Sequence, residues 1–177
     1  MEPSENLLPL FVRELRRLQS LAEQAMVQVD DASFFAVLGE GENSIAIVVK
    51  HVAGNLRSRF RDFLTTDGEK PDRNRDGEFV CAEQETRESL LAAWEEGWSI
   101  LFAALAPLTT ADLERLVTIR GEPLTVLQAV TRQLTHYAYH VGQIVLLARH
   151  HAGPGWRSLS IPRGRSADFN RDPTPYL

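Results

Sequence analysis

The chain has 177 residues, of which 44% are hydrophobic and 24% are charged, so its composition is that of one globular domain and excludes a disordered or fibrous protein. Nineteen Lys and Arg against 24 Asp and Glu give a net charge of −5. This sign argues against nucleic-acid binding, which depends on a basic surface. The single cysteine, Cys81, excludes an internal disulfide framework.

The chain shows no targeting signal. Its first residues are acidic where a signal peptide is basic, and its apolar runs are far shorter than the ~20 residues that span a bilayer. We therefore expect one cytoplasmic domain over residues 1–177, with no membrane partner.

Two amphipathic helices are predicted in the first third of the chain. Over residues 8–29 the apolar residues recur in alternating steps of three and four, as in a helix that buries one face. A break follows near Gly39, and Asn43 or Ser44 offers an N-cap for a second helix. The apolar stripe of this second helix is Ile45, Val49, Val52, Leu56, Phe60 and Phe63.

The middle of the chain combines a long connection, a third helix and a hairpin. Residues 65–84 have no sustained period and are rich in charged and turn-forming residues; a loop of this length indicates a role. The third helix carries Trp94 and Trp98 on its apolar side, and Pro107 ends it. Residues 116–125 are typical of a small β-hairpin, although Pro123 weakens its second strand.

The last helix is predicted from about Thr125 to His151, where a Gly-Pro-Gly sequence stops it. Four helices of about 20–27 residues joined by long connections predict an all-α fold, a four-helix bundle with long crossover loops and a small hairpin before the last helix.

A tail of residues 153–177 follows the last helix. It contains too many large apolar side chains for a solvated end: Trp156, Leu159, Ile161 and Phe169. We expect it to fold back along the bundle and to aim Arg163 or Arg165 at the cleft described below. The alternative is that it packs against a second subunit of a homodimer.

Two histidines of the last helix lie off its apolar stripe. On a helical wheel, His136 and His140 share a strip with Gln133 and Gln143, about 120° from the centre of the core face. The i, i+4 spacing brings both imidazoles within reach of one metal ion. Tyr137 stands where the HExxH zinc proteases carry their glutamate, which excludes that class.

The second helix repeats this arrangement, because His51 lies beside Asn55 with nearly the same offset from its apolar stripe. If the two helices are neighbours, the three histidines meet in a cleft at the edge of the bundle. The alternative is a solvated polar face without a ligand.

Several other polar residues are candidates with competing interpretations. In the long connection, Arg73, Arg75, Asp76 and Glu78 form either an anion-binding rim or internal ion pairs. Cys81 has no base near it in the sequence and is interpreted as a packing residue. Trp94 and Trp98 are spaced as core residues, with a dimer contact as the alternative.

The sequences around the histidines resemble the DinB-like superfamily. The matching strings are Asn43-Ser-Ile-Ala-Ile-Val-Val-Lys-His51 and His136-x-x-x-His140-x-Gly-Gln143-Ile. The resemblance extends to a subfamily through Asp67-Gly-Glu-Lys-Pro-x-Arg-Asn-Arg-Asp76, through Glu78-Phe79 and through Ser158-Leu-Ser-Ile-Pro-Arg-Gly-Arg-Ser166, and it covers nearly the whole chain.

The resemblance implies a four-helix bundle with one divalent metal held by His51, His136 and His140. It also implies metal-dependent transfer of low-molecular-weight thiols such as bacillithiol or mycothiol to electrophiles. Three histidine ligands do not distinguish among zinc, nickel and iron. We thus expect a metal-dependent enzyme that acts on small molecules, namely a thiol-dependent S-transferase. The alternatives are a metal-dependent hydrolase and a non-catalytic metal-binding bundle for sensing or assembly. Expected substrate contacts are Asn55, Arg75, Gln143 and Arg163.

Overall fold

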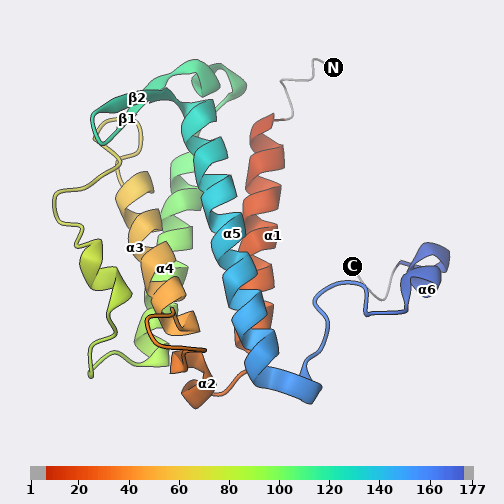
Figure 1. Cartoon of the computed structure of the whole chain (residues 1–177). Helices are drawn as coiled ribbons and strands as arrows, with labels where there is room; N and C mark the ends of the chain where they lie inside the picture. Colours follow the sequence, from red (N-terminus) through yellow and green to blue (C-terminus); the bar gives the residue numbers. More distant parts are fainter. Residues whose placement is uncertain (1–6, 174–177) are drawn as a thin grey trace.

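The computed structural model describes residues 7–173, and four long helices carry the fold (Figure 1). They lie side by side and are joined by connections that run along the outside of the bundle. The helices are α1 (Leu7–Met26), α3 (Ile45–Phe60), α4 (Arg87–Leu105) and α5 (Val126–Ala152). The predicted all-α bundle with a small hairpin is therefore confirmed.

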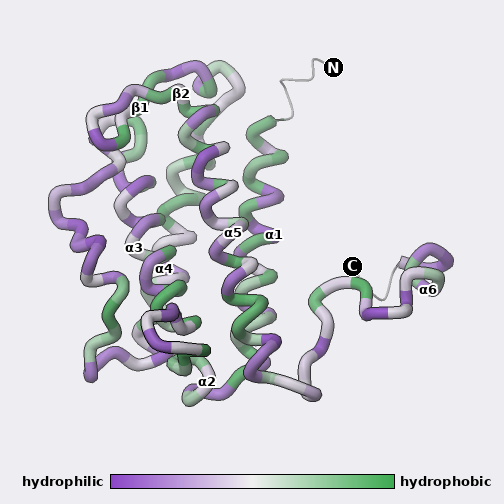
Figure 2. The backbone as a smooth tube through the Cα atoms, in the orientation of Figure 1, coloured by the Kyte–Doolittle hydropathy of each residue, from purple (hydrophilic) through white to green (hydrophobic). Residues whose placement is uncertain are grey.

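The helices form where the apolar periodicity predicted them. In α1 the predicted seam from Leu8 to Ala25 is buried throughout, and Met26 extends it. Figure 2 shows the same alternation as hydrophobic and hydrophilic turns along each helix. α3 packs against α4 and α5, and α1 packs against α5, so the apolar stripes enclose one core. Trp94 and Trp98 are both buried in it, as predicted for core residues.

α3 is shorter than predicted. It ends at Phe60 because Arg61 turns to an extended conformation and Asp62 adopts a positive φ of 50°. Phe63 nevertheless stays buried and its ring contacts that of Phe60, so the apolar stripe continues past the end of the helix. A further short helix, α2 (Asp31–Phe35), was not predicted; the Asp30 side chain caps it.

The predicted hairpin is present at one end of the bundle, formed by β1 (Leu116–Ile119) and β2 (Glu122–Thr125). Arg120 and Gly121 form its turn, both with positive φ, as a two-residue hairpin loop requires. Both carboxylate oxygens of Asp67 accept hydrogen bonds from these two backbone amides, each at 2.8 Å. The long connection thereby holds the hairpin turn beside α3.

That long connection runs down the outer side of α3 and contains the 3₁₀ helix η2 (Asp76–Phe79), which packs on α3. A second 3₁₀ helix, η3 (Thr110–Glu114), precedes the hairpin. Within residues 7–173, no helix combines the length and the apolar character needed to cross a membrane.

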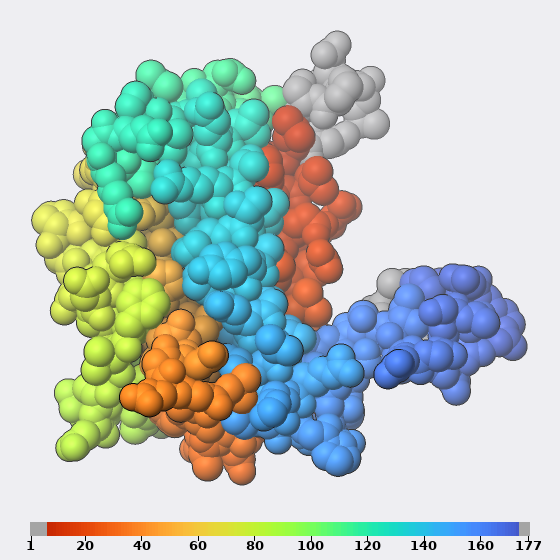
Figure 3. Space-filling view, in the orientation of Figure 1, coloured from red at the N-terminus to blue at the C-terminus, as the bar shows by residue number. Residues whose placement is uncertain are grey.

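The tail leaves α5 through the 3₁₀ helix η4 (Gly153–Gly155) and ends in α6 (Ser166–Arg171). Gln28 of the first connection exchanges two hydrogen bonds with the backbone of Arg157, and Trp156 and Leu159 lie against the core. Figure 3 shows α6 projecting from the body of the molecule. A groove of about 810 Å³ separates Ile161 and Phe169 from the outer face of α1 and α5. Residues 174–177 of the predicted tail lie outside the described part.

Candidate metal centre

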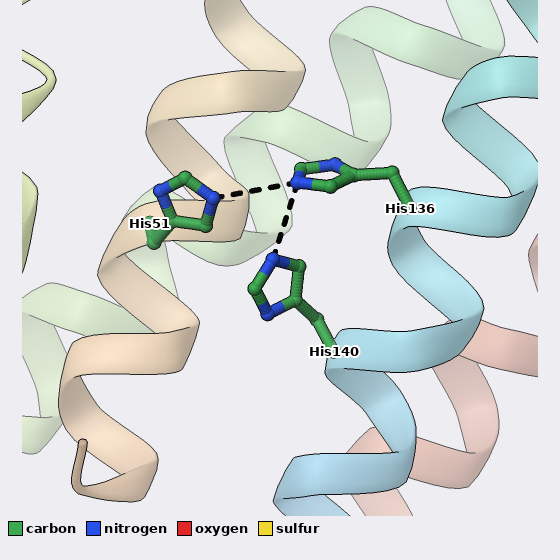
Figure 4. A group of neighbouring side chains, drawn as sticks. All are labelled: His51, His136 and His140. Carbon is green, nitrogen blue, oxygen red and sulfur yellow. Dashed lines mark hydrogen bonds between the residues drawn. The ribbon is translucent and has the colours of Figure 1, made fainter. Parts of the chain in front are cut away.

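Two neighbouring helices bring the three predicted histidines together (Figure 4). α3 begins at the Ser44 N-cap, whose side chain accepts from the Ile47 amide, and it carries His51 on its second turn. α5 begins at the Thr125 capping box and presents His136 and His140 one turn apart. All three imidazoles point into the space between the helices. The condition for the predicted cleft, that these two helices are neighbours, is therefore met.

The facing atoms of the three rings are Nε2 nitrogens. The Nε2 of His136 lies 3.4 Å from that of His51 and 3.1 Å from that of His140, and one ligand nitrogen from each ring falls within 4.8 Å of the others. Imidazole binds zinc at about 2.0–2.1 Å, so two nitrogens on one tetrahedral ion stand about 3.3–3.4 Å apart. Two of the three nitrogen pairs thus stand at nearly the spacing of ligands on one shared ion, and the third lies within 4.8 Å.

The opposite nitrogens of two of the rings are held by acceptors. His51 Nδ1 lies 2.8 Å from Glu78 Oε2, and His140 Nδ1 lies 2.8 Å from Gln143 Oε1. Because both oxygens accept, each Nδ1 carries the proton and donates, which leaves a lone pair on each Nε2. Partners of this kind fix the tautomer and orientation of metal-binding histidines. His136 Nδ1 is buried, and it has no hydrogen-bond partner among residues 7–173.

Glu78 reaches His51 because α3 has a glycine at the point of contact. A Cβ on Gly54 would stand 2.8 Å from Glu78 Cδ and nearer still to Oε1, so a larger residue at position 54 would displace the carboxylate. Arg73 clamps the same carboxylate with hydrogen bonds of 2.8 and 2.9 Å. Burial alone raises the pKa of Glu78, but hydrogen bonds from His51 and Arg73 outweigh it and hold the pKa below its usual value. Glu78 is therefore ionised.

The polar strip is not a solvated face. His51 and His140 are each 5% exposed, and Asn55 and Gln133 beside them are also buried. Glu78 and Phe79 of η2 contact His51, and Tyr137 of α5 contacts Asn55. Burial lowers the pKa of His136 to about 3 and that of His140 to about 4. Both rings are neutral near pH 7, as metal coordination requires.

A cavity of about 250 Å³ opens beside the histidines, and three of the four predicted substrate contacts line it: Asn55, Arg75 and Gln143. Asn55 is oriented by Tyr137, whose buried hydroxyl donates to Asn55 Oδ1 at 3.0 Å. The fourth predicted contact, Arg163, is an exposed tail residue and does not line the cavity, and the same holds for Arg165. The tail instead faces α1 and α5 across the groove that separates it from them.

The structure separates the two interpretations of the charged residues in the long connection. Arg73 and Glu78 form an internal ion pair and contribute no free rim, whereas Arg75 does face the cavity. Four further lining residues were not identified as candidates from the sequence: Arg59, Arg120, Arg132 and Tyr139. Tyr139 directly precedes His140 in the histidine motif, whereas the three arginines carry no motif and reach the cavity from α3, the hairpin turn and α5.

Cys81 agrees with its interpretation as a packing residue. It is half-buried, it does not line the cavity, and burial together with Glu85 raises the pKa of its thiol. A nucleophilic cysteine requires the opposite shift.

Comparison with known proteins identifies the family of the chain. Residues 2–165 match the family described as "Protein of unknown function (DUF1572)". No curated protein and no solved structure gave a significant match. The matched segment includes all four bundle helices and the three histidines, and on this evidence the chain belongs to the DUF1572 family.

Proposed function

We propose that this protein is a divalent-metal-dependent enzyme that acts on small molecules, and that its reaction is a thiol-dependent S-transfer. The observation that carries the proposal is the convergence of three histidine Nε2 atoms beside a cavity. Within residues 7–173, no fourth His, Cys, Asp or Glu joins this group. Structural zinc sites have four protein ligands, whereas catalytic sites keep a position open, so the three-ligand arrangement favours an enzyme.

Each polar residue of the site has a distinct role in this proposal. His51, His136 and His140 hold the ion, and Glu78 and Gln143 keep two of the rings in the binding tautomer. A divalent ion in such a site lowers the pKa of a bound thiol or water and polarises a carbonyl group. The rings of Phe79 and Tyr139 flank the histidines and restrict water at the cavity.

The thiol in this proposal is a cosubstrate. Cys81 is the only cysteine of the chain, and it stands outside the cavity with a raised thiol pKa. A thiol-dependent reaction at the histidines therefore requires a low-molecular-weight thiol from solution. The resemblance to the DinB-like superfamily, with its bacillithiol- and mycothiol-dependent members, supports the same assignment.

Metal analysis tests the site. The untagged protein is washed with a weak chelator, and its bound metal is measured by mass spectrometry for the unmodified chain, for His140→Ala and for His150→Ala. We expect about one metal ion per chain in the unmodified protein and in His150→Ala, and almost none in His140→Ala. His150→Ala is the control because His150 is an exposed residue outside the site. Full retention of metal by His140→Ala would contradict the proposal.

A thiol-consumption assay tests the reaction. Metal-loaded protein is mixed with a small thiol and a panel of electrophiles, and free thiol is followed over time, with His140→Ala as the control. Metal-dependent loss of thiol supports S-transfer. Metal-dependent hydrolysis without thiol loss would replace it with the hydrolase alternative, and bound metal with neither activity would indicate a non-catalytic bundle.

A further inference from the structure

The cavity beside the histidines is strongly basic. In the described part of the chain, five arginine side chains and no aspartate or glutamate line it, although the net charge of the chain is −5. They come from four separate segments, namely α3, the long connection, the hairpin turn and the start of α5. The five residues are Arg59, Arg73, Arg75, Arg120 and Arg132.

Two of these arginines are part of the framework. The side chains of Arg59 and Arg73 are only 5% and 4% exposed, and each contacts a carboxylate behind the cavity wall. Arg59 Nη2 lies 2.9 Å from Glu69 Oε2, and Arg73 Nε lies 2.8 Å from Glu78 Oε1. These two carboxylates balance the two buried guanidinium groups.

The other three arginines leave an excess of positive charge. The Arg120 guanidinium shares Glu69 with Arg59, while the Asp67 carboxylate beside it binds the backbone amides of the hairpin turn. Arg75 and Arg132 are half-exposed, and their nearest carboxylates are 3.9 and 4.0 Å away on solvent-exposed side chains of the rim. Exposed pairs at such distances are weak, so both guanidinium groups stay available to a ligand.

This excess of positive charge raises the electrostatic free energy of the cavity, and a bound anion would lower it. Like charges repel one another, and a divalent ion on the three histidines would add to the positive potential of the same cavity. An anion that contacts the arginines reverses the sign of that interaction. Guanidinium groups also match carboxylate and phosphate oxygens in bidentate geometry, which suits them to substrate recognition.

We propose that the cavity binds a small anionic substrate, whose carboxylate or phosphate group contacts Arg75, Arg120 and Arg132 while its remaining atoms face the histidines. This inference rests on the proposed function, since it names the substrate class of that site. The cavity of about 250 Å³ holds roughly eight water-sized groups, which limits the ligand to a small organic acid or phosphate ester. The Phe79 and Tyr139 rings contact a short apolar portion of it.

Calorimetric titration of the chelator-washed, metal-free protein tests this inference. The probes are succinate, inorganic phosphate and neutral succinamide, which matches succinate in size. We expect succinate and phosphate to bind, to bind more weakly at high salt, and to lose about tenfold or more in affinity in Arg75→Gln/Arg132→Gln. Succinamide should not bind.

The matched control is Arg13→Gln/Arg149→Gln, which removes the same charge from exposed positions outside the cavity and should bind both anions like the unmodified chain. Three results would each overturn the inference. They are equal affinities for both double variants, binding of succinamide as tight as that of succinate, and no binding of either anion. Because these titrations contain no metal, their failure is distinct from a failure of His140→Ala to lose metal, which contradicts the proposed function alone.

Discussion

Substitution of Gly54 by alanine tests how the long connection supports the metal site. The added methyl group would stand 2.8 Å from Glu78 Cδ, well inside the ordinary contact distance of 3.4–4 Å. Because α3 is fixed by the core, we expect the carboxylate to move, and its 2.8 Å hydrogen bond with His51 Nδ1 would then be lost. No metal ligand and no charge is changed by this substitution.

The expected effect is a loss of metal affinity. Removing the partner that orients a metal-binding histidine typically costs 10- to 100-fold in affinity, which corresponds to about 1.4–2.8 kcal/mol. Alanine in place of glycine in a helix contributes about 0.5–1 kcal/mol of stability, which offsets part of the strain in the fold. Metal affinity is therefore a cleaner measurement here than the free energy of unfolding.

The assay is competition for zinc against a chromophoric chelator at pH 7.5. Gly142→Ala is the matched control, since Gly142 also lies within a long helix but its added methyl group would meet no atom of the described residues within 4 Å. We expect a 10- to 100-fold weaker Kd for Gly54→Ala and an unchanged Kd for Gly142→Ala.

A double-variant cycle identifies the cause. If the methyl group acts by displacing Glu78, then Gly54→Ala should have little further effect once Glu78→Ala has removed the carboxylate. Unchanged zinc affinity in Gly54→Ala would refute the reasoning, and equal additional losses in both backgrounds would show that Glu78 is not the mediator.

Three further outcomes are expected. The pKa values of His136 and His140 fall to about 3 and 4 on folding, so the unfolded chain binds more protons than the folded chain below pH 6.5. The metal-free protein should therefore lose stability as the pH falls from 6.5 to 4.5. Urea unfolding should show a loss of at most about 1.4 kcal/mol per pH unit for each histidine. A double His136→Gln/His140→Gln variant should flatten this slope. Metal removal should leave the far-ultraviolet circular dichroism nearly unchanged, because the core is built from apolar side chains of all four helices; loss of most helical signal would contradict this. Trp98→Ala should lower the free energy of unfolding by about 3–5 kcal/mol in urea titrations, since Trp98 is 1% exposed, and a loss under 1 kcal/mol would show that the site collapses around it.

The features that the sequence predicted are those with a local cause. Helical periodicity repeats every three to four residues, so the seam of α1 and the stripe of α3 were readable without any knowledge of neighbours. The same wheel placed His136 and His140 on one strip and His51 on another with a similar offset. The hairpin turn at Arg120 and Gly121 was likewise a local signal, although the sequence alone did not show that its arginine would face the cavity.

The features that only the tertiary structure decided depend on contacts between distant residues. Glu78 could be read as a rim residue until its contacts with His51, 27 positions away, and with Arg73 became visible. Arg120 reaches the cavity because Asp67, 53 positions earlier, holds its backbone amide. His51 is covered because η2 packs on α3 and contacts it through Glu78 and Phe79. A charged, aperiodic loop carries no local pattern that states which helix it covers, because its position is set by hydrogen bonds and ion pairs that form only once the helices have packed.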